Sequence, residues 1–121
     1  MNQIYDVSTN LDNTLLGIFP GRDKNATLTI KNTGTGLDYY KVEISNADGI
    51  TAKANITLTD TILPGGTLLV TINFDVAGGE EPAQVKYWIN VTSQEAEEDG
   101  LEIMKTTTID IKIKETYGVF I

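Results

Sequence analysis

The sequence predicts an all-β fold, an antiparallel β-sandwich of seven to eight strands in two sheets. Apolar and polar residues alternate along several segments, a period that turns one face of a strand to a core and the other to water. The β-branched residues Thr, Val and Ile are frequent, and they suit pleated surfaces better than helices. Turn sequences rich in Gly, Asn and Pro separate the alternating segments, and these residues favour chain reversal.

The first strands can be assigned in chain order from the residues expected on their buried faces. Two segments around residues 4–7 and 14–19 are the least regular. Three segments follow, and their inward positions are Ala26, Leu28 and Ile30, then Tyr40, Val42 and Ile44, then Ile56 and Leu58. A Pro-Gly-Gly corner at residues 64–66 opens a long alternating run, whose inward positions are Leu68, Val70, Ile72, Phe74 and Val76.

Two more long strands complete the sandwich, and an acidic loop joins them. Their inward positions are Val85, Tyr87, Ile89 and Val91 in the first strand, and Thr107, Ile109, Ile111 and Ile113 in the second. The loop, residues 93–100, ends in Gly, and we expect a hairpin connection with one helical turn. Its carboxylates match no calcium-loop spacing, so a solvated tip is the favoured interpretation.

Composition and charge exclude several functions. The chain has 121 residues, a net charge of −8 and a sequence pI of ≈ 4.3, so nucleic acid is a poor partner and anionic lipid surfaces are disfavoured. It has no Cys and no His, which removes disulfides, thiolate metal sites and the commonest general base. The Asp and Glu residues fall on loops and outward strand faces, where nothing desolvates them. We therefore expect no enzyme activity, no catalytic residue, no metal and no cofactor.

The length suits one domain. We expect residues 1–116 to form a single β-sandwich, and residues 117–121 to be a terminal strand or the start of a next module. The apolar run Val119, Phe120 and Ile121 is one that a self-sufficient domain rarely leaves exposed. No apolar run is long enough to span a membrane, so direct membrane insertion is not expected. No signal peptide opens the chain, which indicates either a cytosolic protein or a piece of a larger exported one. An odd number of strand passages would leave the two ends at opposite poles.

Three short motifs carry a resemblance to a known family. They are a strand end, Asn32-Thr33-Gly34, a corner, Leu63-Pro64-Gly65, and a second strand end, Val91-Thr92-Ser93. Over residues 14–114 the chain resembles immunoglobulin-like β-sandwich repeat domains of archaeal and bacterial cell-surface proteins, similar to accessory modules of some glycosidases. The resemblance implies a non-catalytic structural, spacer or adhesive module in tandem arrays, outside the cell and within a larger exported protein. Its partners would be neighbouring domains of the parent chain or envelope proteins.

Tyr87 is expected to pack inward early in its strand. In immunoglobulin-like sandwiches a Tyr at this place bonds its hydroxyl to backbone upstream, in a tyrosine corner. The alternative is a core Tyr whose hydroxyl lies at the rim.

Three Asn-x-Thr sequons begin at Asn25, Asn55 and Asn90. In an exported protein such Asn residues accept N-glycans, provided that they lie on the surface and the host glycosylates. In each sequon the middle residue is the inward apolar one, so Asn and Thr are both expected to face solvent. The competing interpretation is chance, because Thr-rich alternating strands generate this triplet readily.

Trp88 is the only Trp, and the strand register points it away from the core, near Lys86 and, if their strands pair, Tyr39. Exposed aromatic residues stack on sugars or anchor a partner, so Trp88 and Tyr39 are candidate contacts for a glycan or a protein. A covered or merely apolar outer face is the structural alternative. Two other functions therefore stand beside the spacer: a carbohydrate-binding accessory module, and a filament subunit that donates its terminal strand through Val119–Ile121.

Overall fold

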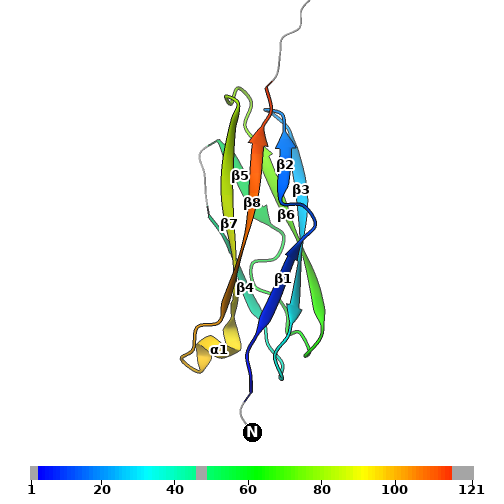
Figure 1. The fold of residues 1–121 in the computed structure, drawn as a ribbon, viewed down its shortest axis with the longest axis vertical. Helices are drawn as coiled ribbons and strands as arrows, with labels where there is room; N and C mark the ends of the chain where they lie inside the picture. Colours follow the sequence, from blue (N-terminus) through cyan, green and yellow to red (C-terminus); the bar gives the residue numbers. More distant parts are fainter. Residues whose placement is uncertain (1–2, 46–48, 116–121) are drawn as a thin grey trace, which may run out of the picture.

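The computed structural model describes residues 3–45 and 49–115, which form a sandwich of two four-stranded sheets (Figure 1). The first sheet has the order β1-β3-β6-β5 and the second has the order β2-β8-β7-β4. The elements are β1 (Val7–Leu11), β2 (Leu15–Ile18), β3 (Asp23–Asn32), β4 (Tyr40–Ile44), β5 (Ile50–Ala54), β6 (Thr67–Val76), β7 (Ala83–Ser93), α1 (Gln94–Glu98) and β8 (Met104–Ile113). The predicted fold class is confirmed, and so is the single helical turn before the last strand.

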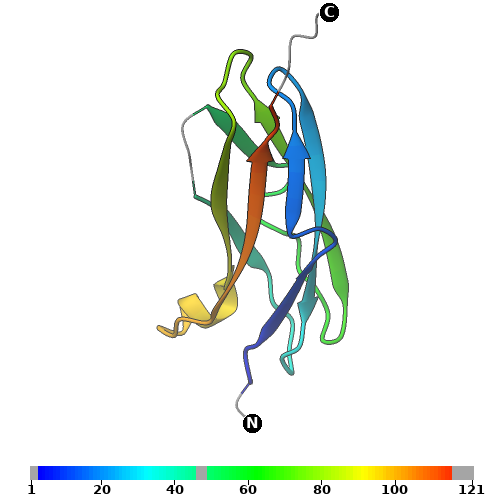
Figure 2. The same ribbon diagram turned by 45° about the horizontal axis from the view of Figure 1, so that its top comes forward.

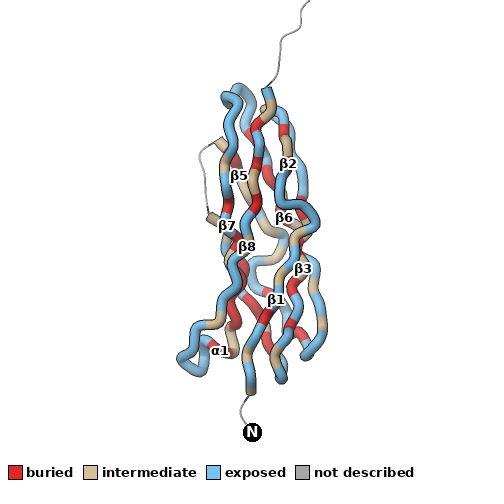
Figure 3. Tube along the Cα trace, in the orientation of Figure 1, coloured by how far each residue is buried: buried red, intermediate tan, exposed pale blue. Residues whose placement is uncertain are grey.

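One continuous core lies between the sheets, because the inward positions of the long strands all face it (Figure 3). Phe74 on β6 and Tyr87 on β7 join the two layers, with their rings edge to face and their centroids 5.3 Å apart. The largest fully buried side chains include Tyr40, Tyr87, Phe74, Ile18, Leu28, Ile30, Ile72, Ile89, Ile109 and Ile111. Alternation therefore predicted the buried face of each long strand correctly.

The N-terminal strand changes sheets without reversing direction. β1 pairs with β3 in the first sheet, and β2 continues along the second sheet parallel to β8. All other strand pairs are antiparallel. Since β1 and β2 together make one passage, eight strands cross the molecule an odd number of times. The described chain therefore begins at one pole and ends at the other (Figures 1 and 2).

The strand predicted around Ile56 and Leu58 is wrong. The strand is β5, which ends at Ala54, and at Asn55 the chain leaves the first sheet for the second. There it runs beside β4, where Val42 N–H donates to the Thr57 carbonyl at 2.8 Å. Ile56 still packs against the core, but Leu58 faces outward and is 56% exposed. A crossing segment does not keep the side-chain register of a strand.

Both lateral crossings are fixed in the same way. Asp12 N–H donates to the Thr27 carbonyl at 3.1 Å, and Thr27 N–H donates to Asp12 Oδ1 at 2.9 Å. On the other side, Asn55 N–H donates to the Thr71 carbonyl, and Thr71 N–H donates to Asn55 Oδ1, each at 2.9 Å. Thr27 and Thr71 are themselves paired, so the crossings lie at one level. In each, a side-chain oxygen takes the place of the carbonyl that the departing strand withdraws.

Candidate functional site

Trp88 is half-exposed at 49%, on the outer face of the second sheet. Trp88 pairs with Thr108 of β8 on one side, and on the other its backbone N–H donates to Ser45 Oγ at 2.9 Å. Lys86 and Asn90 are its neighbours on the same face of β7. The indole therefore lies among polar side chains on the outer face of the second sheet. The prediction that it faces out of the core, near Lys86, is confirmed.

Tyr39 lies far from Trp88 although their strands pair. The register places Tyr40 opposite Ser93, and Gln94 N–H donates to the Tyr39 carbonyl at 2.9 Å. Trp88 is six residues from Gln94, or about 20 Å along the strand at 3.3 Å per residue. The Tyr39 hydroxyl donates instead to Glu98 at 3.0 Å, which raises the pKa of Tyr39. The structure does not bring Trp88 and Tyr39 into one site.

The three sequons differ in accessibility. Asn25 and Asn55 are exposed, as expected. Asn90 is half-buried, with its Oδ1 accepting from Thr106 Oγ1 at 2.7 Å, and Thr92 of the same sequon is buried. The prediction of a solvent-facing pair is therefore wrong at Asn90, because β4 and β8 flank β7 there. Asn55 is the most accessible acceptor, since Thr57 of its sequon is also exposed.

The pole where the described chain begins carries tyrosine–carboxylate contacts around α1. The Tyr5 hydroxyl donates to Asp99, and this bond raises the pKa of Tyr5 to about 12. Burial, and then the nearby Glu98, Asp38 and Asp99 carboxylates, raise the pKa of Glu95. Among residues 3–45 and 49–115, no three His, Cys, Asp or Glu side chains are grouped to hold a metal ion.

Buried polar residues at the same pole are features that sequence reasoning missed. Asp38 is 1% exposed; its Oδ2 accepts from Ser93 Oγ at 2.5 Å, and its Oδ1 accepts from the N–H groups of Tyr39 and Glu95. Ser93 Oγ in turn accepts from Ala96 N–H and caps α1. The sequence did contain a signal for the burial of Asp38, because residues two apart on an extended chain point to the same side and Tyr40 was predicted to point inward.

Tyr87 bonds to upstream backbone, but not as a tyrosine corner. Its hydroxyl donates to the carbonyl of Ile50 at 3.2 Å, and Ile50 lies 37 residues earlier, on the other sheet. A tyrosine corner would bond only a few residues upstream. The hydrogen bond instead links the two sheets at the start of β5. Burial raises the pKa of Tyr87.

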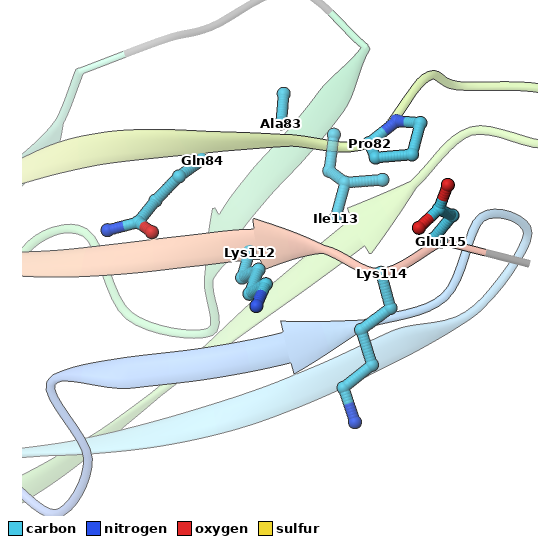
Figure 4. A pocket seen from close by; sticks show the side chains of 7 residues that line it. All are labelled: Pro82, Ala83, Gln84, Lys112, Ile113, Lys114 and Glu115. Carbon is cyan, nitrogen blue, oxygen red and sulfur yellow. The ribbon is translucent and has the colours of Figure 1, made fainter.

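Three hollows on the surface are open to solvent. One of about 400 Å³ lies at the opposite pole, between the start of β7 and the end of β8 (Figure 4). Two smaller hollows, of about 310 and 220 Å³, lie along β5. Glycoside hydrolysis needs two carboxyl groups facing each other across a cleft. Glu115 is the one carboxylate among the side chains that line these three hollows.

No protein-family model matches the sequence, and no curated protein sequence matches it. Solved structures do match. The ASH/PapD-like domain 7 of human CEP192 is 12% identical with a TM-score of 0.67, and the match covers 90% of this chain and 87% of that one. The chain has an immunoglobulin-like β-sandwich fold, and this fold is similar to that of the PapD-like domain.

Two further matches come from different settings. A family 123 glycoside hydrolase from Clostridium perfringens is 10% identical with a TM-score of 0.61; the match covers 92% of this chain but only 27% of the hydrolase. The periplasmic chaperone SfaE is 16% identical with a TM-score of 0.53, and 91% of this chain and 59% of the chaperone are covered. At these identities the likeness concerns the fold alone.

Proposed function

We propose that this chain is a non-catalytic structural module that holds neighbouring parts of an exported cell-surface or envelope protein at a fixed distance. The observation that carries the proposal is the path of the described residues, of which the first and last lie at opposite poles of one continuous core (Figure 2). β3, β6 and β8 each have 10 residues, or about 33 Å of extended chain. A load that enters at one pole is therefore carried along strands to the other.

The N-terminal segment supports this role because it is tied to the pole. Ile4 N–H donates to Thr35 Oγ1 at 2.9 Å, Thr35 N–H donates to the Ile4 carbonyl at 3.0 Å, and Gln3 Nε2 donates to the Leu37 carbonyl at 3.0 Å. A Cβ at Gly34 would lie 2.4 Å from the Ile4 carbonyl oxygen, so only glycine allows this approach. A domain attached before residue 3 would therefore be connected through a segment that is fixed to this pole.

Two observations support an exported setting. The sandwich is similar to a periplasmic chaperone, and it is similar to part of a bacterial glycoside hydrolase. Among the described residues, no helix is both long and apolar enough to cross a membrane. An archaeal or bacterial surface protein, as the motif resemblance implies, remains our proposed source. Domains of the parent chain or envelope proteins are the proposed partners.

The spacer role is tested by measuring length. Because the chain has no native Cys, dyes can be attached at Gln3→Cys and Glu115→Cys in one copy, and at the outer ends of a fusion of two copies. We expect a narrow distance distribution in one copy, and an increase of about 30 Å or more in two. Two copies that fold back to the length of one would contradict the proposal, as would turnover of chromogenic glycosides by the single copy.

Carbohydrate binding is a second candidate, and Trp88 is the observation that favours it. A half-exposed indole among Asn, Thr and Lys side chains offers a stacking face together with hydrogen-bonding groups. A glycan array should then show binding that Trp88→Ala removes and that Leu69→Ala, on the exposed face of the other sheet, retains. Equal binding by both variants would reject a Trp88 site. Tyr39 is too distant to contribute to it.

Glycosylation would fit the same setting, and Asn55 is the proposed acceptor. Its Oδ1 is held by Thr71 N–H, which fixes the orientation of the exposed amide. Intact mass of natively expressed protein should exceed the sequence mass, and Asn55→Gln should remove most of the difference. A native mass equal to that of the bare chain would contradict the assignment.

A further inference from the structure

The pole where the described chain begins carries an exposed apolar pair. Asp38 and Ile62 form a β-bridge and both are buried, so the residues next to them, Leu37 and Leu63, lie opposite each other on the outer side. Leu37 is 51% exposed and Leu63 is 67% exposed. Ile4 adds a third exposed apolar side chain, on the segment that is bonded to residues 35 and 37. We call these three residues the apolar knob.

Acidic side chains border the knob and are held in place. The Tyr39 hydroxyl donates a hydrogen bond to the Glu98 carboxylate of α1, and the Tyr5 hydroxyl donates one to Asp99. Tyr39 and Tyr5 are themselves close in sequence to Leu37 and Ile4. The carboxylates of Glu98 and Asp99, at the C-terminal end of α1, therefore form a negative rim beside the knob that tyrosine hydroxyls hold in place.

The opposite pole presents the complementary features. The hollow of about 400 Å³ there has apolar lining residues Pro82, Ala83 and Ile113. Lys112, near the end of β8, and Lys114, just after it, also line it (Figure 4). Glu115 also lines the hollow. Phe19, 45% exposed, adjoins it, since Lys114 Nζ lies 5.1 Å from the centre of its ring.

We propose that a second copy of this module docks its apolar knob and acidic rim onto the hollow, with Lys112 and Lys114 facing the carboxylates of α1. The proposal rests on the spacer function and supplies the joint between successive modules. The complementary surfaces lie at opposite poles, so the contact is head to tail and generates a row of modules. A symmetric dimer would need one surface to match itself.

The wild-type chain should associate weakly and progressively when examined by sedimentation velocity up to about 1 mM. Leu37→Asp places a charge in the knob, and Lys112→Glu reverses a charge at the hollow; each variant alone should remain monomeric. Each keeps the surface that the other has lost, so an equimolar mixture should form a one-to-one dimer that grows no further. Leu69→Asp, on the outer face of the first sheet and 60% exposed, should associate like wild type.

Circular dichroism on every variant separates loss of docking from loss of folding. A wild-type chain that stays monomeric at about 1 mM overturns the proposal, and so does a mixture that fails to dimerise. Assembly that survives Leu37→Asp but disappears on deleting Tyr117–Ile121 would overturn it in favour of strand donation. The dye-distance measurement on a single copy is independent of association, so failure of the joint is distinguishable from failure of the spacer.

Discussion

The middle of the sandwich and its N-terminal pole both contain buried side chains, but different interactions hold these side chains in place. In the middle, Phe74 and Tyr87 pack within an apolar layer shared by the two sheets. At the pole, buried polar groups are held by hydrogen bonds: Ser93 donates to Asp38, and Asn32 donates to backbone carbonyls. Apolar packing tolerates substitutions of similar volume, whereas a buried polar network requires every partner. The difference suggests that the middle supplies stability and the pole supplies a defined shape.

The largest expected effect is in the middle. Phe74→Ala should lower the free energy of unfolding by about 3–5 kcal/mol, because it removes a ring from the centre of the core and leaves a cavity. Denaturant unfolding followed by circular dichroism measures the change. The matched control is Leu69→Ala on the same strand, which is 60% exposed and should change stability by less than about 0.5 kcal/mol. Similar losses in the two variants would contradict the assigned register.

At the pole, Asp38→Ala should cost about 1–3 kcal/mol, since it leaves Ser93 Oγ and the N–H of Glu95 without their acceptor. Hydrogen exchange should show faster exchange at the amides of α1 while the amides of β6 stay protected. Asp38→Asn retains an acceptor oxygen and should lose less. Uniform loss of protection in both regions would mean that the pole is no separate unit.

The two regions share a response to high pH through Tyr87 and Tyr40. Burial is the main cause that raises the pKa of each hydroxyl above its ordinary value of 10.0. A raised pKa in the folded chain means that the tyrosine ionises more easily in the unfolded chain. The free energy of unfolding is therefore unaffected by these groups below pH 10 and falls as the pH rises further. Unfolding curves from pH 7 to 12 should fall only at the alkaline end, and Tyr40→Phe should flatten the fall. A decline that begins below pH 9 would contradict this account.

The smallest expected effect concerns Glu95. Its raised pKa means that the folded chain disfavours the carboxylate. The ionised group therefore lowers the free energy of unfolding at neutral pH, and this effect disappears below about pH 4. Glu95→Gln should therefore raise the melting temperature slightly at pH 7 and leave it unchanged at pH 3. The same substitution at exposed Glu97 serves as the control. A destabilised Glu95→Gln variant at pH 7 would show that the carboxylate has a partner that stabilises it.

The sequence allowed the fold to be predicted but not the arrangement of the candidate sites. Parity alone assigned the buried faces of the long strands. The burial of Asp38 was missed although it follows the same parity, because a charged side chain is rarely buried. The crossings at Asp12 and Asn55 depend on which backbone groups a neighbouring strand leaves open, which no local pattern reveals. The distance between Trp88 and Tyr39 depends on the register between β4 and β7, and alternation fixes faces without fixing register.

The most direct test of a spacer that transmits force is single-molecule extension between Gln3→Cys and Glu115→Cys. Pulling at these points loads the parallel β2–β8 pair and the β1–β3 pair along their length, so their hydrogen bonds resist together. We predict that the module keeps its native length until one cooperative rupture, followed by extension of the whole chain. Gradual lengthening at low force, with the strands separating one after another, would contradict the proposed function.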